Sequence, residues 1–71
     1  MIVVALYDWK AEILSFMKDD AMKEILYFET EAQAKMAILS HGVKSNEMRQ
    51  ALASGEVQLI HEGEKWYPNE N

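Results

Sequence analysis

The fold is decided by residues 28–42, FETEAQAKMAILSHG, because this stretch holds both a start and a stop signal for a helix. Thr30 and Gln33 have the spacing of a capping box, in which both side chains satisfy backbone donors, and Glu31 places a negative charge in the first turn. Gly42 is the residue type that most readily adopts the left-handed conformation at a helix C-terminus. We therefore expect a helix that is capped at Thr30 and runs to His41.

The chain before this helix is rich in strand-forming residues. Ile2–Tyr7 is a run of β-branched, aliphatic and aromatic residues with no helical spacing, and Lys23–Glu29 has similar character. Both segments are apolar on their two faces, which is typical of strands that are covered on both sides. Between them, Trp9–Ala21 is ambiguous: its apolar spacing fits a helix, whereas residues 11–17 also fit the second arm of a hairpin, which we favour slightly.

The chain after the helix contains two further elements. Ser45 is a suitable cap for a short helix over Asn46–Ser54, and Gly55 is suited to end it. Residues 56–68 resemble a hairpin with its turn at Gly63-Glu64. This register predicts three cross-strand pairs, Glu62 with Lys65, His61 with Trp66 and Ile60 with Tyr67, and a core-facing set of Val57, Leu59, His61 and Trp66.

These elements predict a single α+β domain over residues 1–68, followed by a loose tail at 69–71. The expected architecture is a small antiparallel sheet with one main helix, a short second helix and a C-terminal β-hairpin. No repeat or interdomain linker is found, since the single Pro and the three Gly fall at element ends.

Composition excludes several classes of function. The 71 residues contain 7 Lys plus Arg and 12 Asp plus Glu, and the resulting net charge of −5 argues against direct binding of nucleic acid. There is no Cys to form a disulfide, a thiolate nucleophile or a thiolate metal site. The apolar run at 2–7 is too short for a signal peptide or a membrane span. We expect a soluble cytoplasmic protein without a membrane partner.

The residues with chemical potential do not form an enzyme motif. His41 and His61 are twenty residues apart without the spacing of a metal site, and we expect them to hold structural roles at a helix end and beside Trp66. The adjacent carboxylates of Asp19 and Asp20 suit a solvated turn better than acid/base catalysis. The sequence therefore predicts no catalytic residues, no metal and no cofactor.

The distribution of apolar residues is what indicates function. The main helix has two apolar stripes on nearly opposite sides, one with Met36 and Leu39 and one with Ala34 and Ile38, so that one stripe needs cover from the second helix, a second copy or a foreign protein. The strands likewise imply an uncovered sheet face. We expect a homodimer or a protein-binding face, and the candidate partner-binding residues are Tyr7, Trp9, Ile38, His41, Ile60 and Tyr67.

An alternative function follows from the acidic residues near the C-terminus. A row of carboxylates can imitate the phosphates of a nucleic acid and occupy a nucleic-acid-binding protein. The residues that would form it are Glu56, Glu62, Glu64 and Glu70.

The layout also resembles that of many small phage-encoded accessory proteins. The resemblance rests on the strand-into-helix segment at 28–34, FETEAQA, and on the closing segment at 63–67, GEKWY. It implies a host protein as partner, such as an enzyme, a transcription factor or a defence complex, which the small protein binds and inhibits. It assigns no residue to a role. The leading hypothesis is a non-enzymatic inhibitor or modulator that acts by protein-protein contact, and the main alternative is a self-associating structural domain.

Overall fold

Strand β1 (Ile2–Asp8) is the centre of a three-stranded antiparallel sheet in the computed structural model, which describes residues 1–63. Its neighbours are β2 (Ile13–Phe16) on one side and β3 (Val57–His61) on the other. Leu6 lies opposite Ser15 in β2 and opposite Val57 in β3. The ambiguous stretch after Trp9 is thus the second arm of a hairpin, as favoured from the sequence, and the predicted α+β class is confirmed.

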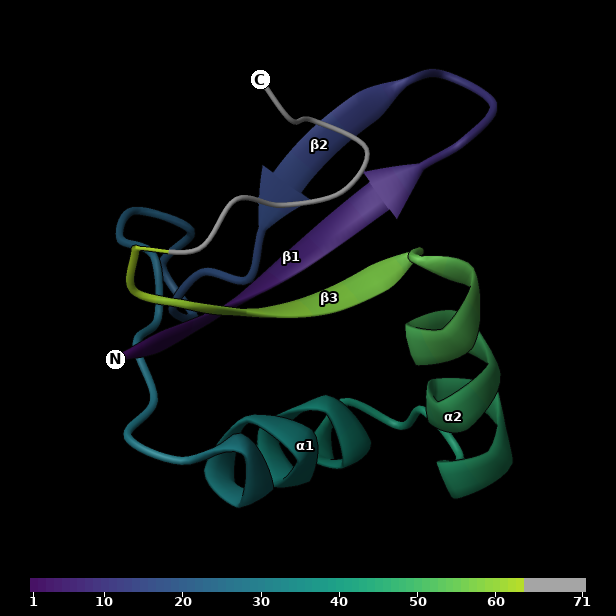
Figure 1. Cartoon of the computed structure of the whole chain (residues 1–71). Coiled ribbons are helices and arrows are strands. Elements are labelled where there is room, and N and C mark those ends of the chain that lie inside the picture. The colour runs from purple at the N-terminus through teal and green to yellow at the C-terminus, as the bar shows by residue number, and fades with distance from the viewer. Residues whose placement is uncertain (64–71) are drawn as a thin grey trace.

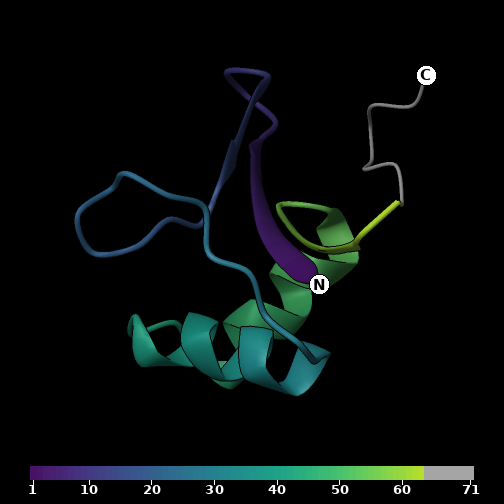
Figure 2. The same cartoon turned by 90° about the vertical axis from the view of Figure 1, so that its left-hand side faces the viewer.

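Helices α1 (Glu31–Ser40) and α2 (Ser45–Ser54) both lie on one side of this sheet (Figures 1 and 2). The capping box of α1 is formed as predicted: the Thr30 hydroxyl accepts from the Gln33 amide at 3.2 Å, and Gln33 Oε1 accepts from the Thr30 amide at 3.3 Å. Gly42 follows the helix with φ of +92°, a conformation that favours glycine. The strongest signal in the sequence therefore gives the expected helix.

The start of α2 differs from the prediction by one residue. Lys44, not Ser45, occupies the N-cap position, and its amide donates to Glu47 Oε1 at 3.1 Å. The carboxylate of Glu47 thus satisfies the amide of the N-cap residue itself, which is the reciprocal contact of a capping box, and Ser45 is the first helical residue. The predicted terminator is confirmed, since Gly55 is left-handed with φ of +87°.

The core lies between β1 and the two helices. Ile2 and Val4 point to the helix side of β1 and pack with Ala34 and Ile38 of α1 and Met48 of α2. Burial of each large aliphatic side chain contributes about 1.5–3 kcal/mol. Val57 and Leu59 of β3 also pack against this cluster, as expected for two members of the predicted core-facing face of that strand.

The two apolar stripes of α1 have different environments. Ala34 and Ile38 face the sheet and are buried, whereas Met36 on the other stripe is 66% exposed. Leu39, also on that second stripe, packs against the edge of the core together with Leu52 of α2. The second helix therefore provides part of the cover that the sequence requires.

Residues 23–29 do not form the predicted strand. They make two isolated bridges, Phe28 with Ile2 and Ile25 with Lys18. The reason is that β2 already pairs with β1 from Asp8 to Ala5, and Met17 then donates to the Val4 carbonyl at 2.9 Å. Only Ile2 remains available on that side of β1, so the segment pairs there at a single residue.

The predicted C-terminal hairpin is described only in its first arm. β3 supplies that arm, and Gly63 has a positive φ of +89°, as a turn residue often does. The second arm and its three cross-strand pairs lie beyond residue 63, outside the described residues.

Candidate functional site

The hairpin end, which we define as Leu6, Tyr7, Trp9 and Ile13, projects beyond the two helices (Figure 1). Its turn is organised by Asp8, whose Oδ1 accepts from the amides of Lys10 at 2.9 Å and Ala11 at 3.1 Å. This local carboxylate bonding is typical of Asp at the start of a turn. The turn returns the chain so that Ile13 lies opposite Asp8.

The hairpin end carries large exposed apolar side chains. Trp9 meets Tyr7 edge-to-face, with ring centroids 4.8 Å apart and an angle of 90° between the rings. Leu6 and Ile13 are exposed and, with Tyr7, line a shallow pocket beside Glu56. Apolar and aromatic side chains that remain exposed in a small domain are the residue types enriched in protein interfaces.

A second feature, the β2 groove, runs from the hairpin end along β2 to the C-terminal end of α1. It has a volume of about 390 Å³. Its walls are mostly apolar and come from both strands of the hairpin, α1, the segment that follows α1 and the loop after β2: Leu6, Met17, Met22, Ile38, His41 and Val43.

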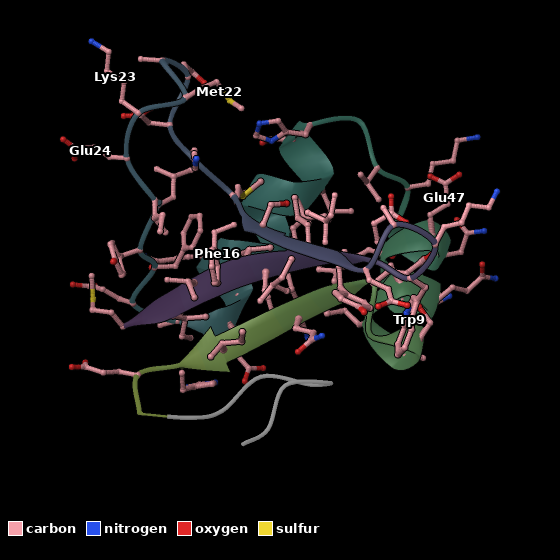
Figure 3. All side chains as sticks on the ribbon, turned by 90° about the horizontal axis from the view of Figure 1, so that it is seen from above. Trp9, Phe16, Met22, Lys23, Glu24 and Glu47 are labelled. Atoms are coloured by element: carbon pink, nitrogen blue, oxygen red, sulfur yellow. The ribbon has the colours of Figure 1, made fainter. Side chains whose placement is uncertain are left out.

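Met22 reaches into this groove from a tight loop. Three hydrogen bonds of Asp19 close the loop. The Asp19 amide donates to the Glu24 carbonyl, and the Asp19 carbonyl accepts from the Met22 amide. The Asp19 side-chain Oδ1 accepts from the Lys23 amide. Met22 itself has a left-handed backbone with φ of +58°, which costs about 1–2 kcal/mol for a residue with a side chain. Figure 3 shows its side chain directed toward the end of α1. The acidic turn predicted at Asp19-Asp20 thus has a structural role in presenting Met22.

The opposite face of the sheet has no helix on it within the described residues (Figure 2). Its apolar residues are Val3, Ala5 and Tyr7 of β1, Leu14 and Phe16 of β2, and Ile60 of β3. Ala5 and Ile60 are buried and the other four are half-buried, whereas Leu6, Trp9 and Ile13 of the hairpin end are exposed.

The six candidate residues from the sequence are distributed over three places. Tyr7 and Trp9 are in contact at the hairpin end, and Ile38 and His41 both line the β2 groove, although Ile38 is itself buried. Ile60 lies on the opposite face of the sheet, in a pocket with Val3 and Tyr27. Tyr67 is outside the described residues.

No sequence pattern marks Leu6, Ile13 or Met22 as interface residues. Leu6 and Ile13 have the same apolar character as buried strand residues, and their exposure follows only from where the helices end. Met22 lies in a turn, where no periodicity exists to assign it a face. A methionine in a turn therefore has no sequence pattern from which its exposure in a groove could be predicted.

Both histidines have structural partners. His41 Nδ1 lies 2.9 Å from the Ala37 carbonyl at the end of α1, as predicted. His61 Nε2 lies 2.8 Å from Glu31 Oε2, so it joins β3 to the first turn of α1. Within residues 1–63, no three His, Asp or Glu side chains are grouped closely enough to hold a metal ion.

Two of the four glutamates in the predicted acidic row lie among the described residues. Glu56 and Glu62 are exposed, and Glu62 Oε1 lies 3.6 Å from the N-terminal amine of Met1. Glu64 and Glu70 lie outside the described residues, so the row stays a prediction.

Comparison with protein-family models, with curated proteins and with solved structures gives no match for this chain. In the described part of the chain, neither helix has the length and apolar character needed to cross a bilayer.

Proposed function

We propose that this chain is a non-enzymatic protein-binding module, which inhibits or modulates a host protein of the cytoplasm by direct contact through the hairpin end and the β2 groove. One observation carries the proposal: Leu6 lies on the same strand face as the core residue Val4, yet its side chain is 39% exposed beside a groove with apolar walls. An apolar surface of this kind in a small domain is typical of a binding site.

Catalysis has less support from the same residues. Among the described residues, the hairpin end and the groove contain two titratable side chains beside Lys18, the phenol of Tyr7 and the imidazole of His41. His41 Nδ1 already contacts a helix carbonyl. A general acid or base needs a positioned partner and a substrate site that excludes water. Contact with a protein requires only the exposed apolar surface.

A foreign protein is a better partner than a second copy of the chain. Two copies each carry a net charge of −5, so their encounter is opposed by like charge. The resemblance to phage-encoded accessory proteins supports a host protein as the partner class. Self-association is the rival hypothesis, because the same exposed apolar residues would also be hidden in a dimer.

Site-specific photo-crosslinking tests the proposal with a matched pair of methionines. Met22 lines the groove and is 72% exposed, whereas Met36 is 66% exposed on α1 and does not line it. A photo-crosslinking amino acid is placed at one or the other position in the full chain, and the source cells are irradiated. We expect one dominant heterologous adduct from position 22 and none from position 36.

Two results would contradict the proposal. Equal adducts from both positions would indicate non-specific contact, and a dominant adduct between two copies of this chain would establish the self-associating domain instead. Sedimentation equilibrium of the purified chain provides a second readout, for which we expect a monomer.

A further inference from the structure

The β2 groove has a charge pattern that is opposite to that of the whole chain. The net charge is −5, but no carboxylate of residues 1–63 lines the groove, and the permanently charged residue in its described lining is Lys18. Within residues 1–63, Lys18 makes no ion pair. The neighbouring Asp19 does not line the groove, and its carboxylate accepts from the Lys23 amide. The groove therefore combines apolar walls with one available positive charge.

The groove also lies against an edge strand. β2 pairs with β1 on one side and is the outermost strand of the described sheet. Met17 donates its amide to the Val4 carbonyl of β1 at 2.9 Å, whereas its carbonyl accepts from the Leu26 amide at 3.0 Å. Ser15, two residues earlier, lies opposite Leu6, and its backbone groups are likewise directed toward β1. Since backbone groups alternate along an antiparallel strand, Leu14, which comes directly before Ser15, directs its N–H and C=O to the outer edge.

Side chains of an added strand would alternate between the two faces of the sheet. Ser15 and Met17 point to the helix side, where they line the groove together with Ile38 of α1. A strand that lies along the outer edge of β2 would direct every second side chain to that same side. This is the geometry by which an extended peptide adds to a sheet and places its side chains in adjacent pockets.

We propose, resting on the function proposed above, that the groove receives an extended segment of the partner protein with a large aliphatic side chain beside a carboxylate. The aliphatic side chain contacts Met17, Met22 and Ile38, and the carboxylate pairs with Lys18. The outer edge of β2 at Leu14 holds the backbone of the segment. Complementary charge selects an acidic segment over a basic one.

Selection from a displayed library of random peptides tests this assignment on the full chain. We expect enriched sequences with aliphatic residues at every second position and an Asp or Glu nearby. Binding of a synthetic peptide from the enriched set should fall at least about tenfold in the Lys18→Glu variant. The matched control is Lys10→Glu, which changes the net charge equally but lies in the hairpin turn and does not line the groove.

A charge exchange makes the test specific. If the peptide carboxylate pairs with Lys18, replacing that peptide residue by Lys should restore binding to Lys18→Glu and weaken binding to the unmodified chain. Amide chemical shifts of the unmodified chain should change at Leu14 when the original peptide binds.

The failures of the two proposals are distinguishable. Peptides that require Met22 but lack a carboxylate, or whose aliphatic residues are three and four apart as on a helix, would overturn the acidic extended segment while leaving protein binding intact. Peptides that bind Met22→Asp as well as the unmodified chain would exclude the groove altogether. If no peptide is enriched and position 22 also gives no crosslink in cells, both proposals are wrong.

Discussion

Val4 and Leu6 are two residues apart on the same face of the same strand, yet one is fully buried and the other is 39% exposed. The difference arises from where the helices lie. Ala34, Ile38 and Met48 cover Ile2 and Val4, whereas the hairpin continues past both helices (Figure 1). The covered half of β1 holds the fold together, and the uncovered half provides the surface that we assign to binding.

The largest expected difference between the two halves is in stability. Replacing Ile2, which is 3% exposed, by Ala removes core contacts and should lower the free energy of unfolding by about 3 kcal/mol. The equivalent change at Leu6 should cost less than about 1 kcal/mol, because much of this side chain is already in water. Urea denaturation followed by circular dichroism measures both values.

A small domain with a deleted core residue can fail to fold, so a milder pair sharpens the comparison. Ile2→Val should cost about 1 kcal/mol, and Leu6→Val only a few tenths. Equal losses at the two positions would contradict the division of β1 into a covered and an uncovered half.

The next largest effect concerns the two helix starts. Thr30→Ala removes a side-chain cap and should cost about 1 kcal/mol. Ser45→Ala should change stability by less than about 0.5 kcal/mol, because Ser45 is the first helical residue and the contact at this helix start is made by the Glu47 carboxylate to the Lys44 amide. Thermal unfolding of the two variants distinguishes these positions. A larger loss at Ser45 than at Thr30 would support the cap predicted from the sequence over the observed one.

Backbone conformation at two turns should give effects of opposite sign. Glu12, which precedes β2, has a left-handed backbone with φ of +58°, and Glu12→Gly should stabilise the chain by about 0.5–1 kcal/mol. Gly42 has φ of +92° and open space where a Cβ would lie, so Gly42→Ala should destabilise by about 1 kcal/mol through strain alone. Chemical denaturation of both variants tests the pair. The same sign of change at both positions would be inconsistent with the turn conformations described.

The smallest effect is expected for the contact between α1 and β3. Glu31 and His61 are both substantially exposed, so Glu31→Gln should cost less than about 1 kcal/mol. At a pH at which the imidazole of His61 is protonated, the loss should shrink further in 1 M salt, which screens exposed charges. A loss as large as that of Ile2→Ala would mean that this pair, rather than the apolar core, holds α1 on the sheet.

The parts of the fold that could be predicted are those specified by local chemistry. Thr30, Gln33 and Gly42 fix the ends of α1 through their own side chains or backbone freedom, and the structure places each as expected. The predicted cap of α2 was wrong by one residue, because the helix starts one residue earlier, where the Glu47 carboxylate accepts from the Lys44 amide.

The parts that could not be predicted depend on competition between distant segments. Residues 23–29 have the composition of a strand, but β2 had already paired with most of β1 on that side. The exposure of Leu6 depends on how far α1 and α2 extend over the sheet, and the position of Met22 in the groove depends on where the Asp19 loop lies relative to the end of α1. Neither the strand pattern nor the turn chemistry contains that information.

The assignment of the β2 groove is tested most directly through the five methionines, which report separately on each region. Met17 and Met22 line the groove, Met48 is in the core, and Met1 and Met36 are exposed elsewhere. In a chain labelled with ¹³C at the methionine methyl groups, we predict that adding the crosslinked partner shifts the signals of Met17 and Met22 and leaves Met36 and Met48 in place. Shifts at Met1 or Met36 without shifts at Met17 and Met22 would show that the binding surface is elsewhere.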